Sequence, residues 1–453
     1  MSLIKRVGLL AGTTALTLTC GSLAGTGADA EKQSDLEARL AAAEAKIAQL
    51  SATSKDNWLT EQRAEEIRSL VQDVLADADT RSSLLSQGVT AGYDGGAVLG
   101  SSDGNWLLRT NILMQQRFIY RQQDNDAAPT VDENRWGFET SRAKFMLSGH
   151  VVNPEWTYRI DADLGSNNRG PIGNQNAYLS YNYGDGWKVT MGQMKAPFLR
   201  EELVEAQHQL AVERSVLNYG FTTGYVDGIT VSNEGEQFRF TAGISDGANG
   251  AGATAMTPDT EFAFTGRVEY LAMGNWGQFE DFTSPQGSEQ GLMIGAALHY
   301  QTAENGAGLA DNDYILFTFD VSWEGDGFNA FFAFILADWD NNVAAADPDP
   351  TAFLVQGGYY LDESWEIFAR YENADWDAAG VEDLGIFTIG VNKYIAGHNA
   401  KWTTDIGFGT DAVDAAGGVA GLSGLPSGFT NFGVDDGTED GQIVLRSQLQ
   451  ILF

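Results

Sequence analysis

The chain ends in the stretch IVLRSQLQILF, residues 443–453, in which apolar and polar side chains alternate. Successive side chains of a β-strand point to opposite faces. One face of this strand carries Ile443, Leu445, Leu449, Ile451 and Phe453, and the other carries Val444, Arg446, Gln448 and Gln450. The stretch therefore predicts a β-strand with one apolar face and one largely polar face.

The same period of two recurs upstream. Ile112, Met114, Phe118 and Tyr120 alternate with Arg109, Asn111, Gln115 and Arg117, and the segment from Trp156 to Leu164 repeats the pattern. A soluble β-sandwich alternates in the same way, so the strands alone do not decide the class. No run of eighteen apolar residues occurs, so the sequence gives no sign of a membrane-spanning helix.

The connections between strands decide the class. Short turns are predicted at 152–154, 184–186, 233–235, 324–327 and 362–364. Longer polar loops are predicted between them, at 121–135, 165–175, 246–260, 301–311, 339–351, 373–384 and 410–440. Short periplasmic turns alternating with long outer loops are typical of outer-membrane barrels. The sequence thus predicts an all-β transmembrane barrel of about sixteen antiparallel strands around a water-filled lumen. The segment 272–289 is the exception, because it is long where a short turn is due.

The residues before the barrel predict export and a helical extension. Lys5 and Arg6, an apolar stretch and then Ala28-Asp29-Ala30 predict a signal peptide over residues 1–30. A lipoprotein acylated at Cys20 is a minor alternative, because the residues before Cys20 lack the usual pattern. Residues 31–56 carry a heptad seam that fits a coiled coil or a solvated amphipathic helix. Residues 57–104 are predicted as a second helix and a glycine-rich linker, and residues 105–453 as the barrel. We expect the barrel in the outer membrane and the extension in the periplasm.

Charge and composition exclude several functions. The formal charge is −35, which rules out a general affinity for nucleic acid. Cys20 is the one cysteine and the four histidines are scattered, so neither a metal site nor a cofactor is predicted. No nucleophile motif or zinc-protease motif occurs, and His150 near Ser148 lies on a predicted inward face, so we expect no enzyme. The acidic outer loops carry oxygen ligands suited to Ca²⁺ or Mg²⁺, although a solvated acidic rim is the simpler interpretation.

Residues 195–220 break the strand rhythm and predict a loop that folds into the lumen. The stretch Gly192-Gln193-Met194-Lys195-Ala196-Pro197-Phe198, the pair Arg200-Glu201 and the triplet Glu213-Arg214-Ser215 resemble the phosphate-selective porin family, porins O and P. The resemblance implies a sixteen-stranded trimer whose third loop narrows a pore lined by basic residues. It also implies that Lys195, Arg200 and Arg214 are the basic residues of the constriction. The terminal Phe453 resembles the insertion signal of outer-membrane proteins.

The distribution of charge is uneven along the barrel. Residues 105–220 hold 12 basic and 13 acidic residues, whereas residues 221–453 hold 6 and 35. The alternation directs Arg109, Arg117, Arg142, Lys144 and Arg159 inward, although each could equally be neutralised by a nearby carboxylate.

These observations predict passive diffusion of small hydrophilic solutes with an anion or phosphate preference. A non-selective or cation-preferring porin remains the alternative, because the second half of the barrel is acidic. A barrel anchor that contacts the cell wall through the N-terminal helices is the third possibility. The expected partners are outer-membrane lipid, small anions and two further copies of the chain in a homotrimer.

Overall fold

The computed structural model describes residues 40–46, 88–123, 134–164, 173–248, 260–303, 313–340, 349–377, 383–410, 432 and 441–453. The chain divides into two units, residues 1–84 and residues 85–453, which are described separately. In the first unit, residues 40–46 are helical. The predicted signal peptide, the rest of the 31–56 segment and the helix predicted before residue 88 lie outside the described residues. Within the described ranges, no helix has the length and apolar character needed to cross a membrane.

The second unit is built from eighteen strands. A hairpin precedes the barrel and comprises β1 (Val89–Tyr93) and β2 (Ala97–Ser101). The first barrel strands are β3 (Leu107–Gln122), β4 (Asn134–His150), β5 (Trp156–Asp163), β6 (Gly173–Gly184), β7 (Trp187–Lys195), β8 (Tyr225–Glu234), β9 (Phe238–Ser245) and β10 (Thr260–Met273). The remaining strands are β11 (Gly291–Ala303), β12 (Asp313–Gly325), β13 (Phe328–Asp340), β14 (Thr351–Tyr360), β15 (Trp365–Asp375), β16 (Leu384–Tyr394), β17 (Ala400–Gly409) and β18 (Ile443–Leu452).

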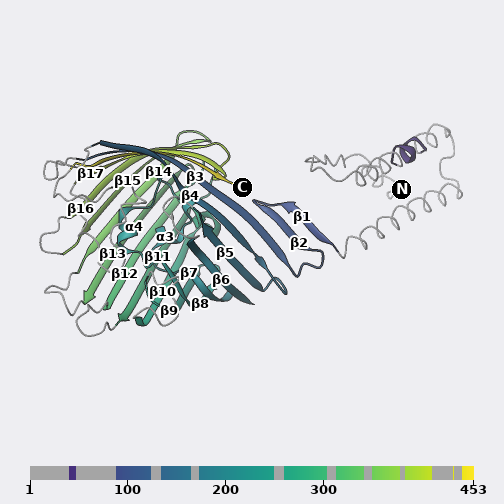
Figure 1. Ribbon diagram of the computed structural model, residues 1–453, viewed down its shortest axis with the longest axis horizontal. Helices are drawn as coiled ribbons and strands as arrows, with labels where there is room; N and C mark the ends of the chain where they lie inside the picture. The colour runs from purple at the N-terminus through teal and green to yellow at the C-terminus, as the bar shows by residue number, and fades with distance from the viewer. Residues whose placement is uncertain are drawn as a thin grey trace, which may run out of the picture. The chain divides into compact units, whose positions relative to one another are not determined.

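Strands β3 to β18 close into a barrel of sixteen antiparallel strands, which confirms the predicted fold (Figure 1). Each strand pairs with the next along the chain, and the terminal strand β18 closes the ring against β3. That seam runs from Ile443 opposite Gln122 to Leu452 opposite Leu113. Closure leaves no free edge in the ring, as a membrane barrel requires.

The outer wall is apolar, because alternate side chains of each strand point outward. In β12, for example, Ile315, Phe317 and Phe319 are exposed and alternate with buried neighbours. Trp136, Trp156, Trp187 and Trp323 lie exposed near strand ends, as interfacial aromatic residues do in membrane barrels.

The inner wall differs from the prediction on one side. The sequence predicts polar inward positions throughout, but β12 to β16 direct several large apolar side chains inward, among them Leu316, Phe331, Ile335, Leu354 and Ile386. These side chains are dry because the segment 196–224 packs over them from inside the barrel. We call this segment the inner loop.

The glycine-rich stretch before the barrel differs from the prediction, because much of it forms paired strands where a linker is predicted. Residues 89–101 form the hairpin β1–β2, and β2 then pairs with β3 from Gly100 opposite Leu107 to Ala97 opposite Thr110. Gly95 supplies the left-handed conformation of the turn, with φ +61°. The hairpin forms because the first residues of β3 extend past the end of β18 and offer an edge to pair with.

Candidate pore constriction

The inner loop follows β7 and contains three short helical turns: α3 (Arg200–Leu203), η1 (Ala206–His208) and α4 (Val216–Phe221). Phe198, Leu210, Leu217 and Phe221 are almost fully buried and belong to the same apolar cluster as the inward side chains of β12 to β16. Burying a large apolar side chain contributes about 1.5–3 kcal/mol. The inner loop is therefore a packed part of the barrel interior.

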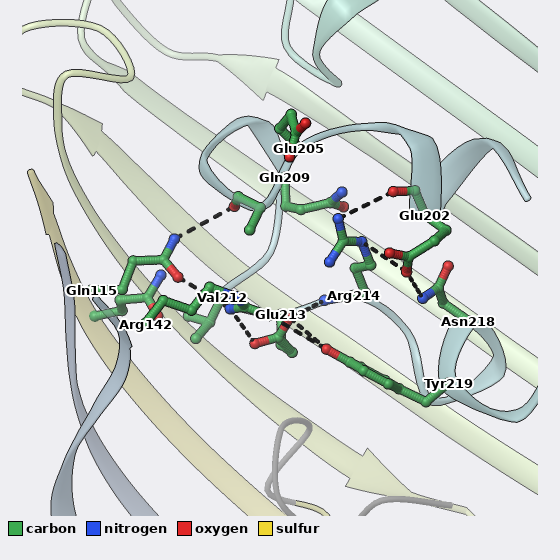
Figure 2. Close-up of polar contacts among 12 residues, drawn as sticks. Gln115, Arg142, Glu202, Glu205, Gln209, Val212, Glu213, Arg214, Asn218 and Tyr219 are labelled. Carbon is green, nitrogen blue, oxygen red and sulfur yellow. Dashed lines mark hydrogen bonds and ion pairs between the residues drawn. The ribbon is translucent and has the colours of Figure 1, made fainter. Parts of the chain in front are cut away.

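Glu213 joins the inner loop to the opposite wall (Figure 2). Its carboxylate accepts two hydrogen bonds of 2.7 Å from Arg142 on β4 and one of 2.9 Å from Arg117 on β3. The Tyr219 hydroxyl donates a further bond of 3.0 Å. Burial alone would raise the pKa of the Glu213 carboxyl, but the two guanidinium groups outweigh burial and hold that pKa well below its usual value.

A second ionic cluster lies where the inner loop leaves β7. The Lys195 ammonium donates to the Glu202 backbone carbonyl (2.6 Å) and lies 3.7 Å from the carboxylates of Glu202 and Glu205. Arg159 of β5 contacts Glu205 and Asp161, each at 2.8 Å.

Arg214 turns back on the inner loop. Its guanidinium donates to the carbonyls of Glu201 and Val204 at 3.0 and 2.7 Å. It also lies 3.5 Å from the Glu202 carboxylate (Figure 2). The Arg214 guanidinium therefore holds together two parts of the inner loop, around residues 201–204 and at residue 214.

The second half of the barrel holds the backbone of the inner loop. The Val216 amide donates to Glu372 of β15 (2.6 Å), and the Val212 amide donates to Asp405 of β17 (3.0 Å). Lys401 donates to the Gln209 carbonyl at 2.7 Å. Several acidic residues of this half thus bind protein rather than line open water.

The long turn, residues 274–290, explains the predicted exception at 272–289. It contains the helical turn η2 (Trp276–Glu280) and contacts the inner loop from the short-turn end of the barrel. The Arg200 guanidinium donates to the Phe279 carbonyl and lies over the Phe282 ring, and the Phe282 amide donates to the His208 carbonyl. The extra length of this segment thus brings Phe279 and Phe282 against the inner loop.

Open space remains beside the wall formed by β5 to β10. A cavity of about 650 Å³ lies there, between the inner loop and the short turns. Its charged lining comprises Arg159, Lys188, Lys195, Arg239 and Arg267, with Glu205, Glu234 and Glu269. This cavity lies to one side of the inner loop, and its charged lining has an excess of basic groups.

The sequence profile of the family described as phosphate-selective porin O and P matches residues 112–402. The chain belongs to this family. The match includes the inner loop and most of the barrel. Porins of this family are channels, and family and fold together indicate the outer membrane.

Solved structures share the fold of this porin. An anion-selective porin from Comamonas acidovorans has a TM-score of 0.55 and 12% identity, covering 76% of this chain and 99% of its own. The outer-membrane protein OmpT of Vibrio cholerae has a TM-score of 0.52 and 12% identity, covering 77% and 98%. The outer-membrane channel DcaP of Acinetobacter baumannii has a TM-score of 0.51 and 12% identity, covering 80% and 100%.

A relative in sequence comes from Aquifex aeolicus (strain VF5) and is described as an uncharacterized protein. It is 25% identical over 262 residues, which span 51% of the porin and 62% of that relative. The porin thus matches less than two thirds of the relative's length.

The structure separates the predicted site residues into groups. Lys195 and Arg159 line the cavity, while Arg200 and Arg214 are not part of its lining. Arg117 and Arg142 are buried against Glu213.

The last two predicted residues lie elsewhere. Lys144 is buried on β4, opposite Asp163 of β5. Arg109 lies at the start of β3, away from the constriction, and pairs with Asp94 of the hairpin.

Sequence reasoning missed several basic residues of the lumen. Arg267, Arg370, Lys401 and Arg446 are buried inward in the second half of the barrel, and Lys188 and Arg239 line the cavity. Strand alternation could have found Arg267, which stands between outward Gly266 and Val268. Among the described residues, no group of three or more His, Cys, Asp or Glu side chains is placed to hold a metal ion. Cation binding by the outer loops stays a prediction, because much of those loops lies outside the described residues.

Proposed function

We propose that this porin carries small hydrophilic solutes by passive diffusion along the β5–β10 wall and prefers anions. The support is the charge of the cavity on that wall. Five basic and three acidic residues line it, in a chain whose formal charge is −35. Because charges that line a narrow path determine ion selectivity, this local excess counts for more than the net charge of the chain.

Within the part of the chain that the structure describes, four of the five basic residues of the cavity lie close to carboxylates, and the fifth, Lys188, does not. Arg159, Lys195, Arg239 and Arg267 each lie within 4 Å of a carboxylate. Lys188 lies exposed in the cavity and has no such partner among the described residues. Its charge therefore acts on solutes without local neutralisation. The structural relative from Comamonas acidovorans bears the description anion-selective, which agrees with this preference.

The test is the reversal potential of the purified porin in a planar bilayer under a KCl gradient. We expect the reversal potential of the native protein to have the sign that anion selectivity gives. We expect the reversal potential of Lys188→Gln to be shifted in the direction of cation selectivity. Lys393→Gln is the matched control, because Lys393 bonds Ser364 and lies over the Trp365 ring at the short-turn end, outside the cavity lining. Cation selectivity of the native protein would instead support the acidic outer loops as the selective element.

We also propose that the porin forms a trimer through β17, β18, β3 and β4. Polar side chains bond one another on the outward faces of these strands: Gln116 with Thr140 at 3.0 Å, and Ser447 with Thr404 and Trp402 at 2.8 Å. Polar groups are costly in lipid, so an outer wall that carries them suits contact with protein. We propose separately that the hairpin and the N-terminal extension, which precede the first barrel strand in the chain, lie in the periplasm, next to the cell wall.

A further inference from the structure

Three polar side chains of the open wall lie directly beside one another across three strands. Lys188 on β7 is opposite Ser232 on β8, and Ser232 is opposite Thr241 on β9. All three line the cavity. Directly opposed residues have Cβ atoms about 5 Å apart, so the three positions span about 10 Å. We call Lys188, Ser232 and Thr241 the polar rung.

The polar rung has unused hydrogen-bonding capacity. None of its three side chains has a hydrogen bond or ion pair with another described residue, and each is at least partly accessible. The rung continues at either end into groups that are occupied. Asn182 donates to the Glu155 carbonyl, and Arg267 pairs with Glu269 and Asp320. The free groups are thus one ammonium and two hydroxyls in a row.

We propose that the polar rung recognises small organic anions that carry hydroxyl groups near the charge. The proposal rests on the anion preference proposed above and specifies the class of anion. Lys188 attracts the anionic group, while Ser232 and Thr241 exchange hydrogen bonds with hydroxyls of the solute. Water satisfies the rung when no solute is present, and a hydroxylated solute replaces those hydrogen bonds whereas an alkyl chain does not.

The constriction argues against compact inorganic phosphate as the best solute. Tight phosphate binding uses arginines that present a free guanidinium edge. The guanidinium groups of Arg142 and Arg117 are hydrogen-bonded to Glu213. The guanidinium group of Arg214 is hydrogen-bonded to carbonyls of the inner loop. An extended solute that uses several weak contacts fits the groups that remain free.

The test compares solutes that differ only in hydroxyl groups. Bi-ionic reversal potentials give the permeability of gluconate relative to hexanoate, and of glycerol phosphate relative to propyl phosphate. The first pair has a carboxylate and the second a phosphate, so the two pairs also report which anionic group the rung prefers. We expect the hydroxylated member to be favoured in at least one pair. The double variant Ser232→Ala/Thr241→Val should lower that preference roughly five-fold, through the loss of two hydrogen bonds.

The control is Thr318→Val, which also removes an inward hydroxyl. Thr318 is buried, and its hydroxyl has no partner and lies outside the cavity. The preference for hydroxylated solutes should stay unchanged in this variant. If the double variant keeps the native preference in both pairs, the polar rung plays no part in recognition. That result is distinct from a failure of the anion preference, which the KCl gradient would reveal in the native protein.

Discussion

At the scale of single residues, the inner loop depends on carboxylates placed against buried arginines. Glu213 is 1% exposed and faces Arg117 and Arg142, which are 1% and 4% exposed. Taking these charges out of water is costly, and their contacts with one another offset part of that cost. Two of the residues that the sequence predicts as attractors of anions thus share the one Glu213 carboxylate, and Glu139 lies 3.5 Å from Arg117.

Glu213→Gln tests this arrangement. The variant removes the carboxylate that two buried guanidinium groups share, which should cost about 3–5 kcal/mol and lower the unfolding temperature of the barrel. It should also shift the reversal potential toward anions. Because the folded pKa of Glu213 is depressed, the native contribution is present above about pH 4.5 and is lost as the pH falls through the folded pKa. The variant should lack that acid-dependent loss.

Glu201→Gln is a useful comparison, because Glu201 binds Ser215 within the loop and lies 3.6 Å from Arg370 on the other wall. A native unfolding temperature and native selectivity in Glu213→Gln would show that the three-residue cluster does not hold the loop.

At the scale of elements, the long turn and the inner loop support one another. Phe282 packs on Phe331 with ring centroids 4.9 Å apart, and His398 contacts Asp281 at 3.0 Å. The His208 and His398 rings lie 4.8 Å apart at this junction, where burial and then the neighbouring His398 lower the pKa of His208 to about 4. A neutral His208 suits this packed junction at physiological pH.

Shortening the long turn should loosen the inner loop. Replacing residues 276–288 by a two-residue turn removes the Phe282 and Phe279 contacts, so single-channel conductance should rise and become noisier. A matched comparison is a two-residue deletion in the short turn 361–364, whose contacts lie among its own residues and neighbouring strands. Unchanged conductance in the shortened protein would mean that the long turn does not support the inner loop.

The sequence predicts the strands well because alternation is a local property. It predicts the inner loop from the broken rhythm at Lys195 to Arg214. It does not predict that Leu316 or Phe331 face inward beneath that loop, since an inward and an outward apolar side chain look the same until the loop is placed. It also cannot assign Glu213 to Arg142, because 71 residues separate them and only closure of the barrel brings them together.

At the scale of the whole molecule, the barrel has two unlike halves. The inner loop fills the half formed by β11 to β18, and the cavity lies against β5 to β10. The outer wall is also uneven, because its bonded polar side chains gather on β17, β18, β3 and β4. The proposed solute path and the proposed subunit contact therefore lie on different parts of the wall.

Removing outward polar groups tests the trimer. Gln116→Leu with Thr140→Val makes this wall more suitable for lipid, so we expect a smaller trimer fraction by native mass spectrometry in detergent. Tyr300→Phe removes one outward polar group from β11 and serves as the control. An undiminished trimer fraction in the double variant would place the subunit contact elsewhere.

The position of the solute path is tested most directly by single cysteines in the barrel, since Cys20, the one cysteine of the chain, lies within the predicted signal peptide. Ser232→Cys lies on the cavity wall, and Thr388→Cys lies inward on β16 but is fully buried. In a planar bilayer, a negatively charged methanethiosulfonate should reduce the current through Ser232→Cys and leave Thr388→Cys unchanged. Equal modification of the two positions, or block at Thr388→Cys alone, would contradict a path along the β5–β10 wall.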